Sequence, residues 1–499
     1  MPDTAARGLS TAPAGAPIIA AMTARPTPSA DTLERLARIV GPANAFTAAA
    51  DIEPYLVEWR DKYRGATPLV LRPGSVAEVS AILALANETR TAIVPQGGNT
   101  GLVGGQVPTP AGNEVVVSLT RLDRIRDVDP AGFTLTAEAG VVLDTIHQAA
   151  SAVDRLFPLS LGAEGSCRIG GNISTNAGGV GVLAYGNTRD LVLGLEVVLA
   201  NGEVWNGLKR LRKDNTGYDL KQLFIGAEGT LGIVTAATLK LFPRPKAMET
   251  AFVGLSSPAD ALALFERARA VAGQSLTAFE IVPRIGLDFV LRHVPGTRDP
   301  LGEAHPWYIL VELSSGDASG TLTAVAENLL AEALEAGIAE DAVLAASLDQ
   351  QAAFWKIRHA LSESQKPEGG SIKHDVSVPI AAIPAFLDEA SAAVEALVPG
   401  ARIVAFGHLG DGNIHFNISQ PVGADKKAFL DRWEEVNAVV HGIVTAMEGS
   451  ISAEHGIGRL KRDLLPGVKS PIELELMRRI KDAFDPNGIL NPGRMLQER

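Results

Sequence analysis

One cysteine, Cys167, is present in this sequence of 499 residues. This excludes an intrachain disulfide framework and any zinc or iron–sulfur site built from several cysteines. It also fits a reducing compartment. Because the first 30 residues show no convincing secretion signal, we expect the protein to be cytoplasmic. Cys167 itself is interpreted as a small residue beside a glycine turn.

Long apolar runs and basic tracts are also missing. No apolar run reaches the ~18 residues that a membrane-spanning helix needs, so no membrane span is predicted. The 57 acidic residues outnumber the 45 basic ones, which gives a formal charge of −12. This balance argues against nucleic acid or an anionic membrane surface as a partner. An anionic ligand must therefore meet local positive charge.

The length predicts two or three domains, and 46% hydrophobic residues can bury large cores. Residues 1–30 are rich in Ala, Pro and Thr and are interpreted as a disordered leader. Residues 31–245 contain short strands mixed with helices, without the regular spacing of a doubly wound fold, so an α+β domain is expected. The expected strands include 91–94, 114–118 and 191–200, the last ending in the hairpin signal Asn201-Gly202.

A second α+β domain is expected at 246–450, after the breaker Pro243-Arg244-Pro245. Alanine-rich stretches at 258–272, 320–336 and 383–397 have helical periodicity and alternate with strands such as 307–313. A C-terminal segment, 451–499, completes the predicted division.

Glycine is abundant, with 50 residues, and three clusters lie in the first domain. In the first, 93–108, consecutive glycines can adopt positive φ and let backbone N–H groups converge on a phosphate or pyrophosphate. An ordinary hairpin loop stays an equal alternative for one cluster alone. The second cluster, 161–185, and the third, 226–232, favour the phosphate-binding interpretation over the hairpin loop. Three polar glycine surfaces favour a long ligand such as a dinucleotide.

Residues typical of metal sites gather late in the chain. His408 and His415 flank a Gly-Asp-Gly turn, and Glu454 stands beside His455 between glycine-rich turns. Two imidazoles and one carboxylate with an open coordination position form a common catalytic metal set. Taken singly, each residue is better explained as a hydrogen-bonded turn histidine or a surface carboxylate. Together they favour a metal site.

The glycine motifs at 95–105, 170–172, 176–179 and 225–232 resemble the flavin motifs of the FAD-binding fold shared by vanillyl-alcohol oxidase and p-cresol methylhydroxylase. The resemblance extends over nearly the whole chain. It implies a two-part FAD-binding domain, a substrate and metal domain, and a C-terminal tail that returns to the FAD domain. FAD is expected to be non-covalent because the first loop contains no His or Cys. The residues expected to bind FAD are Pro95, Gln96, Gly97, Gly98, Asn99, Thr100, Gly101, Gly162, Ser166, Gly170, Gly171, Asn172, Thr175, Asn176, Gly178, Gly179, Gly181, Glu228, Gly229, Ile233 and Asn491.

The late motifs are similar to those of the D-2-hydroxyacid dehydrogenase branch, above all the D-2-hydroxyglutarate dehydrogenases. The resemblance implies a divalent metal, most often zinc, on His408, His415 and Glu454. It also implies that His455 is the general base and that Asn417 contacts the substrate. A metal-bound alcohol loses its proton more easily, and an imidazole can accept that proton near neutral pH.

The resemblance also implies substrate-binding roles for three further residues. Arg358 corresponds to the arginine that binds the C1 carboxylate of the substrate. Ser362 stands where the family has threonine, so the hydroxyl for a hydrogen bond to the substrate is retained. Lys373 corresponds to a lysine that faces the distal carboxylate in hydroxyglutarate-like relatives. A solvated loop lysine is the alternative for Lys373 alone, and the combination favours a dicarboxylate substrate.

The function implied is oxidation of D-2-hydroxyglutarate, and also of D-malate, by hydride transfer to flavin N5. An electron-transfer flavoprotein or quinone is the expected electron acceptor, with oxygen still open, and a homodimer is one open oligomeric state. D-lactate or glycolate dehydrogenases are the alternatives within the family. From other classes, a transferase of the alkylglycerone-phosphate synthase type, an NADPH-dependent reductase and a non-catalytic flavoprotein stay open. The run of adjacent histidines expected in the transferase is not found here.

Overall fold

The computed structural model describes residues 25–498. Residues 1–24, most of the predicted leader, and Arg499 lie outside this range. The last part of the expected leader contacts the body of the protein, because the Arg25 guanidinium bonds the Glu498 carboxylate at 3.0 Å. The first helix then begins at Ala30, after Ser29, whose hydroxyl accepts a hydrogen bond from the Thr32 N–H.

The first sheet has the order β1-β2-β4-β3, and its strands β2, β4 and β3 are parallel. Central strand β4 contains Val115, Val116 and Val117, all fully buried, as expected for a strand covered on both faces. Helix α3 begins after Ser75, whose hydroxyl accepts a hydrogen bond from the Glu78 N–H. The elements are α1 (Ala30–Val40), β1 (Ala45–Phe46), α2 (Ala49–Ile52), β2 (Val70–Leu71), α3 (Val76–Thr89), β3 (Ala92–Gln96) and β4 (Glu114–Ser118).

The second sheet is antiparallel, with the order β5-β6-β10-β8-β9. Strands β8 and β9 form the hairpin predicted at Asn201-Gly202, where Gly202 has a φ of 87°. The strands are β5 (Ile125–Asp129), β6 (Thr134–Glu138), β8 (Val192–Val198), β9 (Val204–Gly207) and β10 (Ile233–Lys240), and the small pair is β7 (Arg155–Leu156) with β11 (Phe242–Pro243). The helices are α4 (Leu143–Ser151), α5 (Ile169–Thr175), α6 (Val182–Tyr185), α7 (Thr188–Leu191) and α8 (Lys221–Phe224).

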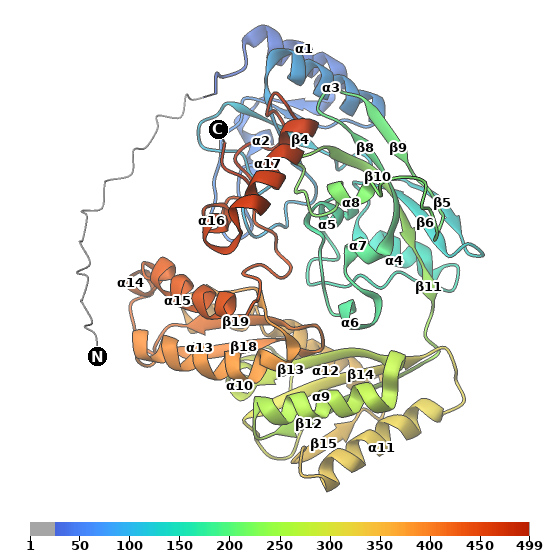
Figure 1. Ribbon diagram of the computed structural model, residues 1–499, viewed down its shortest axis with the longest axis vertical. Coiled ribbons are helices and arrows are strands. Elements are labelled where there is room, and N and C mark those ends of the chain that lie inside the picture. Colours follow the sequence, from blue (N-terminus) through green and yellow to red (C-terminus); the bar gives the residue numbers. More distant parts are fainter. Residues whose placement is uncertain (1–24, 499) are drawn as a thin grey trace, which may run out of the picture.

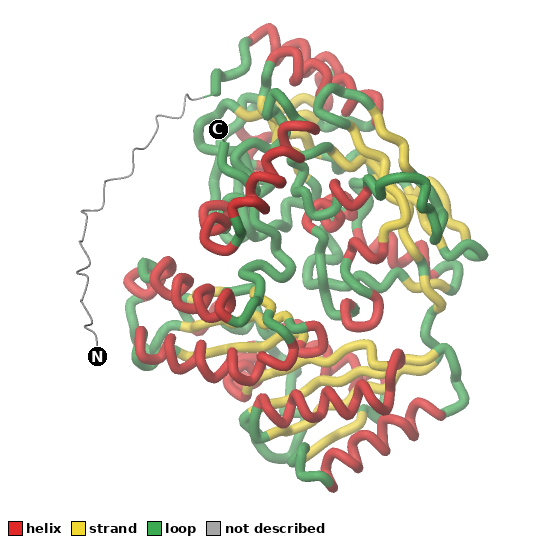
Figure 2. The backbone as a smooth tube through the Cα atoms, viewed as in Figure 1, coloured by secondary structure: helices red, strands yellow, loops and turns green. Residues whose placement is uncertain are grey.

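The third sheet has eight strands in the order β15-β12-β14-β13-β18-β19-β16, with β17 also paired to β19. It lies in the lower half of Figure 1, and Figure 2 shows its strands between helices. Its strands are β12 (Ala247–Leu255), β13 (Leu276–Pro283), β14 (Trp307–Ser315), β15 (Asp341–Leu344), β16 (Ser371–Lys373), β17 (Val376–Ser377), β18 (Arg402–His408) and β19 (Asn413–Ser419).

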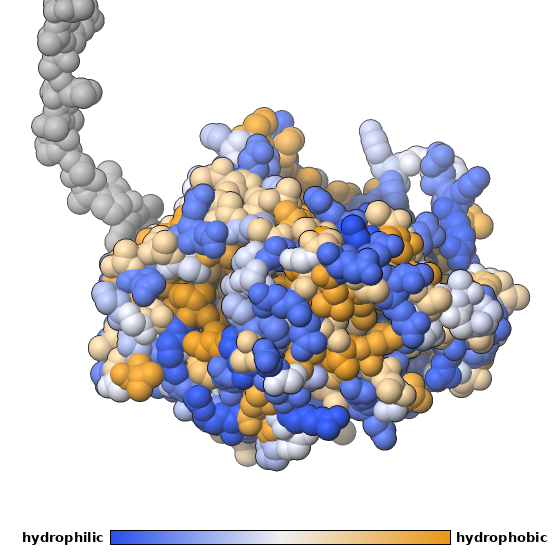
Figure 3. Space-filling model, turned by 90° about the horizontal axis from the view of Figure 1, so that it is seen from below, coloured by the Kyte–Doolittle hydropathy of each residue, from blue (hydrophilic) through white to orange (hydrophobic). Residues whose placement is uncertain are grey.

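Alternating side chains of this sheet enter two separate cores. On β14, Ile309 and Val311 pack against one set of helices, whereas Tyr308 and Leu310 pack against the other. The first set comprises α9 (Pro258–Ala272), α11 (Thr321–Glu335), α13 (Ile383–Leu397) and α15 (Trp433–Ala446), and the second comprises α10 (Arg284–His293) and α12 (Leu348–Ala360). The bounds of α9 and α13 agree with the predicted helices. The face seen in Figure 3 mixes hydrophilic and hydrophobic residues.

The C-terminal segment returns to the first sheet, as predicted. After α14 (Lys426–Leu430), α16 (Leu465–Val468) and α17 (Pro471–Phe484), Leu490 forms a parallel bridge with Ile93 of β3. Arg494 is buried and forms an ion pair with Glu114 of β4, and its Nη2 donates to the Val107 carbonyl at 2.6 Å. The tail is therefore a structural part of the first half of the molecule.

We expect Arg494→Ala to lower the free energy of unfolding by about 3–5 kcal/mol, because it leaves the Glu114 carboxylate buried without its charged partner. Urea denaturation followed by circular dichroism measures this loss. Arg479→Ala is the control, since Arg479 pairs with Glu475 on the exposed face of α17 and should contribute less than ~1 kcal/mol. Equal stability of the two variants would contradict the buried-pair interpretation.

Candidate active site

Two strands of the third sheet position the predicted metal-binding histidines. His408 ends β18, and His415 lies in β19, opposite Phe406. The Gly-Asp-Gly turn reverses the chain between them, with Gly412 at a φ of 90°. His415 is thus a strand residue rather than the turn residue expected from the sequence. The hairpin brings the two imidazole centroids to 5.6 Å.

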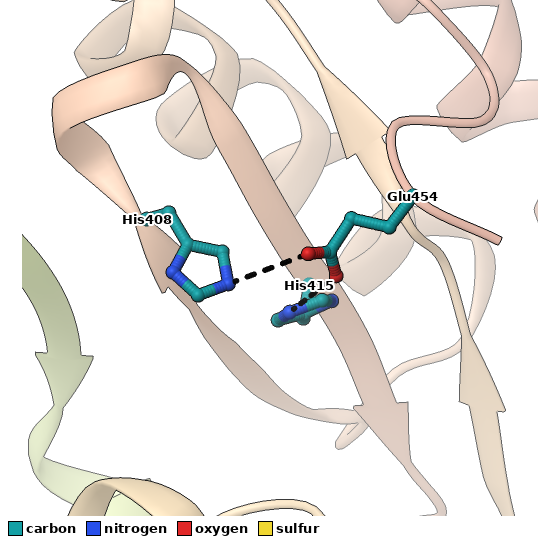
Figure 4. Close-up of side chains that lie close together, drawn as sticks. All are labelled: His408, His415 and Glu454. Atoms are coloured by element: carbon teal, nitrogen blue, oxygen red, sulfur yellow. Dashed lines mark ion pairs between the residues drawn. The ribbon is translucent and has the colours of Figure 1, made fainter. Parts of the chain in front are cut away.

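Glu454 reaches this hairpin from the loop after α15. Its Oε1 lies 3.8 Å from His408 Nε2, and its Oε2 lies 3.7 Å from His415 Nε2. Figure 4 shows the carboxylate facing both imidazoles. Zinc binds such atoms at ~2.0–2.2 Å, so one ion fits between donors separated this way after small side-chain movements. The donor set therefore fits a divalent cation.

Glu280, on β13, orients His408 from the other side and was not identified from the sequence. Its Oε1 lies 2.8 Å from His408 Nδ1, which leaves Nε2 directed toward Glu454. A carboxylate behind a ligating histidine is a common feature of metal sites. Burial lowers the pKa of His408, but the charge and hydrogen bond of Glu280 outweigh it and raise that pKa to about 9. The only sequence signal was a single carboxylate in an apolar strand.

Asp375 is a second residue that sequence reasoning missed. Its Oδ2 accepts the backbone N–H groups of Glu454 and His455, each at 2.9 Å. Its Oδ1 accepts a hydrogen bond from the Asn413 side chain at 3.1 Å. Burial raises the pKa of Asp375, but nearby cationic groups, His455 first, hold it below its usual range. Asp375 therefore positions the segment that contains the predicted metal ligand Glu454 and the predicted base His455.

His455 lies with its Nδ1 3.4 Å from Asp375 Oδ2. Burial lowers the pKa of His455 to about 4, despite the opposing effect of the Asp375 charge. The imidazole is therefore neutral near pH 7 and able to accept a proton. No residue in the range 25–498 hydrogen-bonds its Nε2.

The residues expected to bind substrate surround the hairpin. Arg358 Nε bonds Glu280 at 2.7 Å, and its buried Nη2 has no hydrogen-bond partner among the described residues. Lys373, paired with Asn417 in the sheet, donates from Nζ to the Ser362 carbonyl and hydroxyl at 3.1 and 3.2 Å. Burial and the charge of Arg60 lower the pKa of Lys373 to about 8. The structure thus brings Ser362 and Lys373 together.

The second glycine cluster adjoins this site. A Cβ atom at Gly178 would lie 2.8 Å from Glu454 Oε1, so the glycine turn and the carboxylate are in close contact. A Cβ at Gly162 or Gly171 would meet no protein atom within 4 Å, which leaves room for a ligand against the backbone. Arg168 Nε and Asn172 Oδ1 are buried without a hydrogen-bond partner in the described chain. These features fit a bound FAD.

Several predicted flavin residues are also used by the protein itself. Gly98 and Gly179 are packed against the carbonyl oxygens of Ser166 and Ser160, where a Cβ would clash. The side chains of seven others bond protein atoms: Gln96, Asn99, Ser166, Thr175, Asn176, Glu228 and Asn491. Their side chains therefore hold the loops together, and contact with FAD stays a prediction for all of these residues.

The predicted flavin residues lie in five stretches. These are Pro95 to Gly101 at the end of β3 and beyond, Gly162 and Ser166 before α5, Gly170 to Thr175 in α5, Asn176 to Gly181 after α5, and Glu228 to Ile233 at the start of β10, with Asn491 in the tail.

Among residues 25–498, no helix has the length and apolar character needed to cross a membrane.

A family model described as "FAD linked oxidases, C-terminal domain" matches residues 244–495, and another described as "FAD binding domain" matches residues 67–207. The chain belongs to the FAD-linked oxidase family. It is 39% identical to the mitochondrial D-2-hydroxyglutarate dehydrogenase of Arabidopsis thaliana, over 92% of this chain and 80% of that protein. The predicted FAD-linked oxidoreductase family is thereby confirmed.

Two solved structures share the fold of this chain. Substrate-bound p-cresol methylhydroxylase gives a TM-score of 0.73 at 17% identity, covering 93% of this chain and 96% of that one. Alkyldihydroxyacetonephosphate synthase gives 0.70 at 17% identity, covering 94% and 85%. The predicted two-domain fold is confirmed. Metal, electron acceptor, oligomeric state and cytoplasmic location stay predictions.

We expect the purified protein to retain about one divalent ion per chain, and Glu454→Gln and His415→Ala to lose it. Glu280→Gln should weaken metal affinity by roughly 10–100-fold because His408 loses its orienting carboxylate. Elemental analysis after dialysis against graded chelator measures these losses. The control is His147→Gln, since His147 bonds the Leu159 carbonyl outside the site. Unchanged metal content in the ligand variants would contradict this site.

Proposed function

We propose that this FAD-linked oxidoreductase oxidises D-2-hydroxyglutarate to 2-oxoglutarate, with D-malate as a second substrate. The observation that supports this most strongly is the contact of Glu454 with the Gly178 turn, because it joins a metal-type donor set to the flavin-type backbone. The names of the relatives support the substrate. The Lys373 ammonium bonds Ser362 but forms no ion pair with a carboxylate of residues 25–498, which supports a second carboxylate in that substrate.

His408, His415 and Glu454 would hold the metal, and the glycine turns would hold FAD. When bound, a divalent cation lowers the pKa of a coordinated alcohol, and FAD accepts hydride at its N5. Arg358 orients the C1 carboxylate through its free Nη2, while Glu280 fixes the rest of its guanidinium. The hydroxyl group is thereby directed toward the three metal-type ligands.

His455 accepts the hydroxyl proton at Nε2. Its neutral imidazole provides the acceptor, and the Asp375 carboxylate beside Nδ1 stabilises the charge that develops on the ring. Because the same Asp375 oxygen holds the backbone of Glu454 and His455, the base and the metal ligand keep a constant separation. Placement of Cα by Arg358 and the ligand set would determine which hydrogen faces FAD, and hence the preference for the D enantiomer.

Among the alternatives, D-lactate and glycolate lack a distal carboxylate for Lys373. The transferase alternative shares the fold, but the structural likeness at 17% identity extends to fold alone. The electrons are expected to leave FAD through an electron-transfer flavoprotein or a quinone, in keeping with dehydrogenase chemistry.

Anaerobic mixing with D-2-hydroxyglutarate should bleach the yellow absorbance of the FAD-loaded protein, because hydride transfer reduces the flavin. L-2-hydroxyglutarate should not, and chelation should slow the bleaching strongly, with recovery on metal addition. Stopped-flow absorbance measures each rate. Absence of bleaching with any hydroxyacid would favour the transferase, and bleaching that chelation leaves unchanged would remove the metal from the proposal.

Lys373→Met should lower kcat/KM for D-2-hydroxyglutarate by roughly 10–100-fold, the usual effect of losing a hydrogen bond to a charged group. D-lactate turnover should be preserved. Steady-state kinetics with both substrates measures the difference, with Lys356→Met as control, since that lysine contacts the Pro295 carbonyl at the surface. Equal loss with both substrates would refute the assigned role.

The pH dependence provides a further check of the same residue. Lys373 has a pKa lowered to about 8, so its positive form is present below pH 8 and is lost above it. In the wild type, kcat/KM for the dicarboxylate should therefore fall as the pH rises through about 8. Lys373→Arg should remove this fall because arginine stays charged. Identical profiles in wild type and Lys373→Arg would contradict the prediction.

A further inference from the structure

A loop of the FAD-binding half, residues 57–64, reaches the substrate half. Val57 and Arg64 form an isolated β-bridge at its base. The Val57 carbonyl accepts a hydrogen bond from Asn99 in the first glycine loop at 2.9 Å. At its tip, the Glu58 carboxylate accepts the backbone N–H groups of Arg60 and Lys62 at 2.9 and 3.3 Å. The loop therefore has a defined shape and a fixed base.

Two reciprocal contacts between cations and aromatic rings join this loop to the substrate half. Lys62 Nζ of the loop lies 3.3 Å from the ring centroid of Trp433, which begins α15. Lys366 Nζ of the substrate half lies 4.2 Å from the ring centroid of Trp59 in the loop. A cation over an aromatic face is attracted by the ring quadrupole. These contacts hold Arg60, which lies between Trp59 and Lys62 in sequence, against the substrate half.

Arg60 is half-buried, yet no described residue forms a hydrogen bond or ion pair with its guanidinium. The carboxylates closest to it in electrostatic effect are those of Glu58, Asp375 and Glu363. Each has another partner. Glu58 accepts loop N–H groups, Asp375 accepts backbone and Asn413 donors, and Glu363 pairs with Lys366 at 2.7 Å.

Like Arg60, Lys373 forms no ion pair with a carboxylate of the described residues. Two of its three ammonium donors bond Ser362. Lys366, which lies over the Trp59 ring, pairs with Glu363, and Glu363 directly follows Ser362, the partner of Lys373. The loop contacts therefore place Arg60 in the neighbourhood of Lys373, and the charge of Arg60 accordingly lowers the pKa of Lys373. Neither cation has a carboxylate at ion-pair distance among residues 25–498, and partly desolvated cations of this kind favour the binding of an anion. A guanidinium fork and an ammonium group together suit one carboxylate.

We propose that Arg60 binds the distal carboxylate of the substrate together with Lys373, so that the FAD-binding half helps to select 2-hydroxy dicarboxylates over monocarboxylates. This inference rests on the proposed function and deepens it. It assigns a specificity-determining residue to a loop that lies outside the hairpin and its predicted ligands.

The test compares Arg60→Gln with wild-type holoenzyme on D-2-hydroxyglutarate and D-lactate. We expect kcat/KM for D-2-hydroxyglutarate to fall roughly 10- to 100-fold, as for loss of a charge-assisted hydrogen bond, with D-lactate changed less than about twofold. Calorimetric titration with glutarate should show a similar loss of affinity, which does not require turnover. Arg64→Gln is the matched control, because this arginine of the same loop pairs with Glu53 at an exposed site.

Equal loss with both substrates would show that Arg60 only supports packing of the loop, and unchanged kinetics would show no role; either result overturns the inference. Wild-type flavin bleaching separates this failure from failure of the proposed function. If the wild type oxidises no hydroxyacid, the proposed function fails, and glutarate titration alone decides. Weaker glutarate binding by Arg60→Gln would still support the dicarboxylate site, whereas equal binding would overturn it.

Discussion

The position of the Glu454 carboxylate is the constraint on which the site depends. It lies against two imidazoles of one hairpin on one side and against the Gly178 backbone on the other. A side chain at position 178 would occupy the space of the carboxylate. Gly178 therefore permits the close approach by which the predicted metal ligands lie beside the predicted FAD-binding turn.

Two buried carboxylates maintain this arrangement from behind. Glu280 links Arg358 and His408 from β13, and Asp375 holds the backbone of Glu454 and His455. Buried charges are costly unless they are paired and hydrogen-bonded, and both carboxylates meet that condition. These contacts link strand β13, the β18–β19 hairpin and the loop after α15. The orientation of the functional side chains therefore depends on two carboxylates that need not contact the substrate.

The features predicted from sequence were those with local signals. The Gly-Asp-Gly sequence predicted the turn between His408 and His415, although not the strands on either side of it. The Asn201-Gly202 pair predicted the β8–β9 turn, and helices α9 and α13 followed their periodicity. Glu280 was missed because it stands alone in an apolar strand and meets His408 only through strand pairing across a long sequence separation. The position of Arg60 depends on contacts between the two halves, which no local pattern encodes. Glycines such as Gly98 were assigned to FAD because a tight chain crossing and a ligand cradle require the same residue type.

Anomalous X-ray diffraction at the zinc edge, from crystals of the FAD-loaded protein prepared with zinc, tests the central claim most directly. The account predicts one strong peak between His408 Nε2, His415 Nε2 and the Glu454 carboxylate, beside the flavin ring. A peak bound by other residues, or no peak in crystals shown to contain stoichiometric zinc, would contradict it.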